Sequence, residues 1–204
     1  TENHFITCCI TFLSSILMAA MFFRSRPQIF TFIIMLAELY MLEKFVKSGK
    51  LKDLIGIPVL SLLLINLHSS MWAMLFVFML PYFAGAIKLN FKKLRQDPCC
   101  SFPKLLIIAV ISFAMGFINP YGTKAMTYIF TSFGYEEISG YISEMAAIQL
   151  GNATGYLMFV IILVFVAIML LKRGCFSTRF VLLYIGTLVL ALGTQKSISY
   201  FVIA

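Results

Sequence analysis

The sequence predicts an all-α integral membrane protein, built as a polytopic helical bundle of about seven spans. Its composition is the first reason, because 61% of the 204 residues are hydrophobic and only 12% are charged, unlike an average soluble domain. Apolar runs of helix length also recur along the chain, whereas the strand-length alternation typical of outer-membrane barrels is absent. Finally, most basic residues lie in short segments between these runs, as in helical membrane proteins.

Two spans are predicted at the start of the chain, over residues 5–23 and 28–42. The first lacks the basic start of a signal peptide and is followed by further apolar runs, so we interpret it as a span. Glu38 lies in the second span, about 9 Å along the helix from Lys44, and we expect its carboxyl group to reach the membrane interface at that end. The lysine-rich segment 44–53 follows.

The central run from Leu54 to Ile87 contains no Asp, Glu, Lys or Arg and predicts one short broken hairpin. As a single helix it would be about 51 Å long, whereas the hydrocarbon core of a bilayer is roughly 30 Å thick, so the run should fold back on itself. The polar island Asn66-Leu67-His68-Ser69-Ser70 is the predicted apex, between helices over 54–66 and 71–87. Because the first helix covers only about 20 Å, we expect the island to lie below the membrane surface, buried in protein or lining a wet cavity.

Three further spans are predicted over residues 105–118, 153–171 and 180–192. The outer-face segment 119–151 begins with Asn119-Pro120-Tyr121-Gly122, whose Pro and Gly positions suit a tight turn. Two short helices that lie in the membrane interface are predicted beyond the turn, because apolar residues recur there at helical spacing. These residues are Met126, Ile129, Phe130 and Phe133, and then Ile138, Tyr141, Ile142, Met145 and Ile148.

The two ends of the chain resemble cut ends. The sequence starts at Thr1, and residues 199–204 begin another apolar run without completing it. We therefore expect residues 1–204 to form a single transmembrane domain that is a fragment of a longer protein.

The positions of Lys and Arg predict the topology. If segments 44–53, 88–104 and 172–179 face the cytoplasm, that side holds most of the 16 Lys and Arg residues, and residues 1–4 lie inside. This rule explains the net charge of +8, so we expect membrane lipids and not nucleic acid as partners. The other face then receives four polar clusters: Arg24 with Arg26, the 66–70 island, the 119–151 segment, and Gln195 with Lys196.

Two of these clusters contain groups with binding or acid–base chemistry. Arg24 and Arg26 either bind a phosphate or diphosphate through bidentate guanidinium contacts, or extend to lipid headgroups. His68 is either a general base, a proton relay or a ligand to substrate hydroxyls, or it is a buried histidine satisfied by Asn66 and Ser69. Both interpretations remain open for each cluster.

The acidic residues of the outer-face segment are further candidates. Glu136, Glu137 and Glu144 either position a divalent cation or an acceptor hydroxyl, or are solvated surface carboxylates. No second histidine or acid lies near His68 at metal-ligand spacing, so no metal site is predicted. The sequence also lacks a Gly-rich phosphate loop, a nucleophile elbow and a metalloprotease helix.

Four short motifs occur in an order that resembles a known family. They are Arg26-Pro27-Gln28, Asn66-Leu67-His68-Ser69-Ser70, Asn119-Pro120-Tyr121-Gly122 and Ile142-Ser143-Glu144, and a closing segment runs from Gln195 to Phe201. This ordered set resembles the bacterial polytopic glycosyltransferases of the C-type fold, which take a sugar from a polyprenyl-phosphate donor. The resemblance covers most of the chain.

The resemblance implies a transferase of the bacterial cytoplasmic membrane that moves a hexosyl or other glycosyl group to an acceptor on the non-cytoplasmic face, as in cell-envelope polysaccharide synthesis. His68 and Glu144 are then catalytic candidates. The family's acidic residue in an early outer loop would precede Thr1, so the usual catalytic acid is missing here. A divalent cation would be compatible with the reaction, but no ligand spacing indicates one. The substrate-binding candidates are Arg24, Arg26, Gln28, Asn66, His68, Asn119, Tyr121 and Lys196.

Two other classes of protein remain open. A broken helix with a polar tip also occurs in transporters, although the two halves of this chain show no convincing self-similarity. A lipid-carrier-binding subunit without chemistry would explain the loss of the catalytic acid. An outer loop with Asp or Glu upstream of Thr1 would favour the transferase, whereas a repeated hairpin would favour a carrier.

Overall fold

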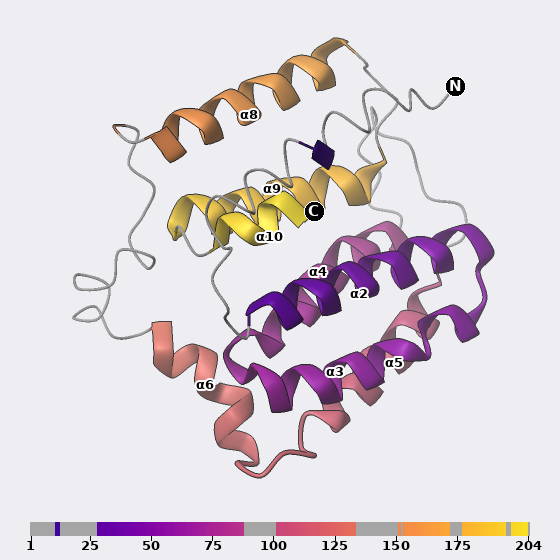
Figure 1. Cartoon of the computed structure of the whole chain (residues 1–204). Helices are drawn as coiled ribbons and strands as arrows, with labels where there is room; N and C mark the ends of the chain where they lie inside the picture. Colours follow the sequence, from indigo (N-terminus) through magenta and orange to yellow (C-terminus); the bar gives the residue numbers. More distant parts are fainter. Residues whose placement is uncertain are drawn as a thin grey trace.

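The computed structural model describes residues 28–87, 101–133, 153–171, 177–194 and 197–203, together with Thr11, Phe12 and Gly151. All the elements in these ranges are helices, which confirms the all-α prediction (Figure 1). They are α2 (Gln28–Ser48), the 3₁₀ helix η1 (Leu51–Leu54), α3 (Gly56–Leu67), the 3₁₀ helix η2 (Ser69–Met71), α4 (Trp72–Ala86), α5 (Phe102–Met115), α6 (Thr123–Phe133), α8 (Ala153–Leu171), α9 (Thr178–Gly193) and α10 (Ile198–Ile203).

The helices form a bundle in which segments distant in sequence are neighbours. Helix α3 packs against α2 and α5, and α4 packs against α9 and α2. Helix α10 folds back on α9 and also contacts α2. In Figure 1, α8 lies at the outer edge beyond α9 and α10, while α6 lies at one end of the bundle, where it packs against η2.

Helix α2 extends further than the predicted span over residues 28–42. It continues to Ser48 because Leu42, Phe45 and Val46 prolong its buried face at helical spacing. The helix ends at Ser48, and the φ of 66° at the next residue, Gly49, is the left-handed conformation that glycine adopts without a side-chain clash. The N–H of Gly49 donates a hydrogen bond to the Phe45 carbonyl at 2.7 Å.

The predicted hairpin is confirmed, with its apex at the polar island. Helix α3 ends at Leu67, the backbone of His68 leaves the helical conformation (φ −153°, ψ 69°), and α4 begins at Trp72. The indole N–H of Trp72 donates a hydrogen bond to Ser61 Oγ at 2.8 Å. Ser61 in turn donates to the Ser112 carbonyl at 2.7 Å. These two buried hydrogen bonds join α3, α4 and α5 below the apex.

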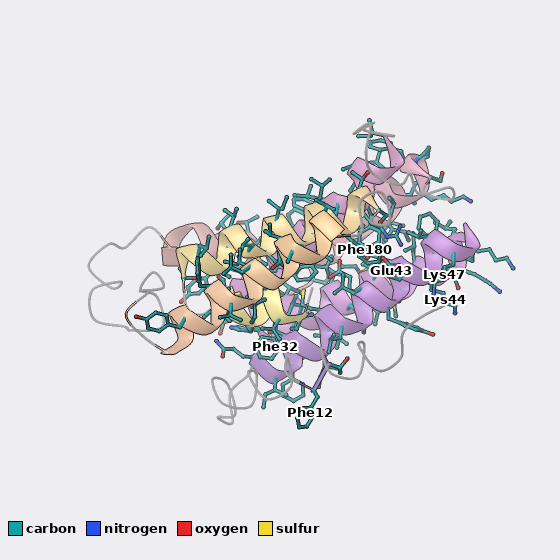
Figure 2. All side chains as sticks on the ribbon, turned by 90° about the horizontal axis from the view of Figure 1, so that it is seen from above. Phe12, Phe32, Glu43, Lys44, Lys47 and Phe180 are labelled. Carbon is teal, nitrogen blue, oxygen red and sulfur yellow. The ribbon has the colours of Figure 1, made fainter. Side chains whose placement is uncertain are left out.

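The described parts of the three basic segments meet at the end of the bundle opposite the apex. Lys104 Nζ donates a hydrogen bond to the Gly49 carbonyl at 2.7 Å, and Arg179 forms an ion pair with Glu43. Figure 2 shows Glu43 beside Phe180, with Lys44 and Lys47 towards the same end. The sequence predicts that the three basic segments lie on one side of the membrane, and their described parts do lie at one end of the bundle.

One helical run in the described residues, Ser69–Ala86, is long and apolar enough to cross a membrane. The helices Phe102–Met115 and Thr178–Gly193 are apolar but shorter. Membrane association is thus supported by one candidate span, and the seven-span topology stays a prediction. The predicted span over 5–23 and the second interfacial helix of the outer-face segment lie outside the described residues, whereas the first interfacial helix corresponds to α6.

Candidate functional site

His68 lies at the break between α3 and α4, where the helical hydrogen-bond pattern is interrupted. Its N–H still donates to the Leu64 carbonyl at 2.8 Å, and its own carbonyl accepts from the Met71 N–H at 3.0 Å. The half-buried imidazole has its Nδ1 atom 2.7 Å from Oγ1 of Thr31, a fully buried residue in the first turn of α2. The hairpin apex is therefore attached to the start of α2 through the histidine ring.

The hydrogen bond with Thr31 orients the imidazole in either of two tautomers. If Nδ1–H donates to the threonine oxygen, Nε2 is an acceptor and the ring can act as a general base. If the threonine hydroxyl donates to Nδ1, Nε2–H is a donor instead. In both cases Thr31 limits the rotation of the ring, as a general acid or base requires.

Thr31 was not selected from the sequence as a site residue. It lies one helical turn after Gln28, on the face of α2 that also carries Met35 and Glu38. A hydroxyl on the buried face of an apolar helix needs a hydrogen-bond partner. Helical spacing could therefore have indicated Thr31, but it could not have indicated His68 as the partner 37 residues away.

Asn66 connects the hairpin to the turn that follows α5. Its side-chain amide donates to the Leu62 carbonyl at 2.9 Å and to the Ile118 carbonyl at 3.0 Å. The amide of Asn66 therefore does not satisfy His68, and this part of the prediction for a buried histidine is wrong. The hydrogen bond to Ile118 instead holds the apex against the turn that begins at Asn119.

The predicted tight turn at Asn119-Pro120-Tyr121-Gly122 is confirmed. The Asn119 side chain donates to the carbonyls of Gly116 (2.6 Å) and Gly122 (3.1 Å), and its Oδ1 accepts from the Tyr121 N–H at 2.8 Å. Gly122 has a φ of 56°, which favours glycine. The side chain of Asn119 thus stabilises the turn, whereas Tyr121 is 75% exposed and available for contact with another molecule.

Two further elements close the same end of the bundle. Helix α6 packs against η2, and its residues Ala125 and Met126 are buried. Tyr200 of α10 makes an edge-to-face contact with Phe32, the neighbour of Thr31, at a centroid distance of 6.1 Å. The start of α2, the hairpin apex, α6 and Tyr200 of the closing segment are therefore neighbours at one end.

Of the predicted site residues, His68 contacts Thr31, which lies one turn after Gln28 on α2, and Asn66 contacts Ile118, which directly precedes the turn of Asn119 and Tyr121. Arg24, Arg26, Glu144 and Lys196 lie outside the described residues, as do Glu136 and Glu137, so that their roles stay predictions. Within the described ranges there is no group of three or more His, Cys, Asp or Glu residues that could hold a metal ion.

A second polar cluster, at the opposite end, joins α2, α4 and α9. Arg179 donates from Nε and Nη2 to Oε1 and Oε2 of Glu43 at 2.8 and 2.9 Å, and the Tyr82 hydroxyl donates to Oε1 at 2.9 Å. The guanidinium group also lies over the Phe180 ring, 4.5 Å from its centroid. The pair fixes α9 against α2, and no spacing rule could have found partners 136 residues apart.

The connection between α2 and α3 contains a smaller polar cluster around Asp53. The Ser48 hydroxyl donates to one carboxylate oxygen of Asp53, and Lys44 Nζ lies 3.2 Å from the other. The hydrogen bond from Ser48, followed by the interactions with Lys44, lowers the pKa of Asp53 from its ordinary value. This cluster stabilises the turn that reverses the chain.

None of the family models, curated proteins and solved structures compared with this chain matches it.

Proposed function

We propose that the protein is a membrane glycosyltransferase that transfers a sugar from a polyprenyl-phosphate donor to an acceptor on the non-cytoplasmic face of the bacterial cytoplasmic membrane. The observation that supports this proposal is the meeting of motif residues at one end of the bundle. His68 contacts Thr31, which follows the Arg-Pro-Gln motif, and Asn66 is hydrogen-bonded to the turn that contains Asn119. These residues come from segments that are distant in sequence, and the packing of α3 against α2 and α5 brings them to one end of the bundle.

The apolar exterior of the helices is compatible with a lipid-linked donor. Large hydrophobic side chains are exposed along α2, α3 and α5, where they would be unfavourable in water. Lipid tails, including the isoprenoid chain of the donor, would cover them. They include Ile33 and Leu36 on α2, Val59 and Leu63 on α3, and Leu106, Ile107, Val110 and Phe117 on and just after α5.

The proposed reaction requires mainly charge binding and orientation, because the donor already carries a phosphate leaving group. The acceptor hydroxyl oxygen attacks the anomeric carbon, the bond between that carbon and the phosphate oxygen breaks, and polyprenyl phosphate leaves with the electron pair. The hydroxyl proton passes to Nε2 of His68, whose Nδ1–H donates to Thr31 in this step. Arg24 and Arg26 bind the phosphate in this proposal.

The test is transfer of labelled sugar from a polyprenyl-phosphate donor by the complete protein in lipid vesicles. We expect His68→Gln to lower the rate at saturating donor by about 100-fold or more, the usual contribution of a general acid or base. Lys47→Ala, at the opposite end of α2, is the matched control and should retain the wild-type rate. Movement of donor across the vesicle membrane without sugar transfer would overturn the proposal in favour of a carrier.

A further inference from the structure

Glu38 is a fully buried acid in the middle of α2, with an exposed fraction of 0%. Within the described residues neither carboxylate oxygen has a hydrogen-bond partner. Its neighbours on the buried face of α2, Met35 and Leu42, are also fully buried. The expectation that this side chain reaches the membrane interface is therefore wrong, because the face of α2 that carries it packs into the bundle.

The position of Glu38 lies between the two polar clusters of the bundle. Thr31, which contacts His68, lies seven residues earlier, about 10 Å along the helix axis. Glu43, which binds Arg179 and Tyr82, lies five residues later, about 7.5 Å along the axis. Glu38 therefore lies along α2 between Thr31, which is buried near the start of the helix, and the half-buried Glu43 nearer its end.

None of the titratable groups described on the elements around α2 forms a hydrogen bond or ion pair with Glu38. The charge nearest in sequence, on Glu43, is already balanced by Arg179 at 2.8 Å. At the far end, Asp53 is paired with Lys44. The groups on packed elements are Lys52 and Asp53 on η1, His68 before η2, Tyr82 on α4, Arg179 and Tyr184 on α9, and Tyr200 on α10.

An ionised carboxylate needs a cation or several hydrogen-bond donors to compensate for its removal from water. The described surroundings of Glu38 supply neither, so the carboxyl group must carry a proton in this packing. Ionisable residues in the interior of membrane bundles commonly belong to proton or ion pathways. Because Glu38 is completely enclosed by the core, a proton is the ligand small enough to bind its carboxyl group.

We propose that Glu38 is a proton-binding site in the interior of the bundle. The carboxyl group holds its proton while α2 is packed against α3, α4 and α10, and it exchanges that proton when these helices move apart. The site does not depend on sugar transfer, and it would be present in a transferase, a carrier or a lipid-binding subunit.

Infrared spectroscopy of the complete protein in lipid vesicles at neutral pH tests the protonation. We expect a carbonyl stretching band of a protonated carboxylic acid that is lost in Glu38→Gln. The matched control is Glu43→Gln, on the same helix, which should remove a carboxylate band and keep the acid band. Loss of a carboxylate band in Glu38→Gln would overturn the proposal.

A second measurement needs no variant and so does not depend on the folding of Glu38→Gln. Dicyclohexylcarbodiimide is an apolar reagent that adds to protonated carboxyl groups within membranes. After treatment of the wild-type protein, peptide mass spectrometry should find the adduct on Glu38 and not on the ion-paired Glu43. An adduct on Glu43 and not on Glu38 would contradict a protonated carboxyl group at Glu38.

Discussion

At the scale of single residues, the most informative contact is the one between Thr31 and His68. The histidine occupies a backbone conformation outside the helix, and its ring is oriented by a hydroxyl from a different helix, with 2.7 Å between the two atoms. A catalytic imidazole needs such a partner, since its orientation determines which nitrogen meets the substrate. In the proposed transferase, Thr31 is accordingly a positioning residue for His68.

Replacing Thr31 by Val removes the hydroxyl and keeps the shape of the side chain. We expect Thr31→Val to lower kcat for sugar transfer by about tenfold, the effect of one hydrogen bond of roughly 1.4 kcal/mol. Donor binding should remain unchanged, and Thr31→Ser should restore most of kcat. The measurement is kcat and KM for the three proteins, and an equal loss in Thr31→Ser would contradict a role for the hydroxyl.

At the scale of helices, α3, α4 and α5 are held together by close packing around Trp72. Its indole donates to Ser61, and the ring lies against Gly116 at the end of α5. A β-carbon at position 116 would clash with the six-membered part of the Trp72 ring. Glycine is therefore needed at position 116 because the Trp72 ring packs directly against the backbone there, and not because of the backbone conformation.

Gly116→Ala should destabilise the bundle because Trp72 must move away from Ser61. We expect a loss of about 1–3 kcal/mol, the usual effect of overpacking, measured by thermal unfolding in detergent micelles. Gly186→Ala, within α9, is the matched control, because a β-carbon there meets no atom within 4 Å. It should leave stability unchanged or raise it slightly. Equal destabilisation by both variants would argue against the packing explanation.

The connection between α2 and α3 predicts a pH dependence. Because the pKa of Asp53 is lowered in the folded protein, chiefly by the Ser48 hydroxyl, ionised Asp53 contributes stability above its ordinary pKa. This contribution is lost as the pH falls through the lowered value. Ser48→Ala should raise the pKa of Asp53 and weaken the dependence, which an NMR titration of the carboxyl carbon would measure. A pKa unchanged by Ser48→Ala would be inconsistent with this account.

At the scale of the whole molecule, the bundle has two chemically different ends. One end carries Lys44, Lys104 and Arg179, and the other carries the hairpin apex and the turn after α5. The basic end is expected to face the cytoplasm. The apex would then face the opposite side, where an acceptor could reach Tyr121.

This orientation predicts opposite labelling of the two ends. In a variant without its five native cysteines, Tyr121→Cys and Lys47→Cys both place a thiol at an exposed position. We expect an impermeant maleimide to label position 121 from outside the cell and position 47 only after the membrane is opened. Labelling of both positions from the same side would contradict the predicted topology.

Much of the helical pattern could be predicted because it depends on local features. The uncharged run with its polar island predicted α3, the break at His68 and α4, and apolar spacing predicted α5, α6, α8 and α9 to within a few residues. Predictions were poorer where a tertiary contact determined the outcome. Helix α2 passed its predicted end because Phe45 and Val46 are buried, and Glu38 faced the core and not the interface.

The sequence by itself determined that the chain is helical and apolar, where its hairpin bends, and which segments carry positive charge, because these properties follow from composition and spacing along the chain. Only the tertiary structure decided that Thr31 meets His68, that Asn66 meets Ile118, and that Glu43 meets Arg179. These contacts depend on how helices pack against one another. The spacing of residues within one helix does not indicate which residues of another helix will contact it.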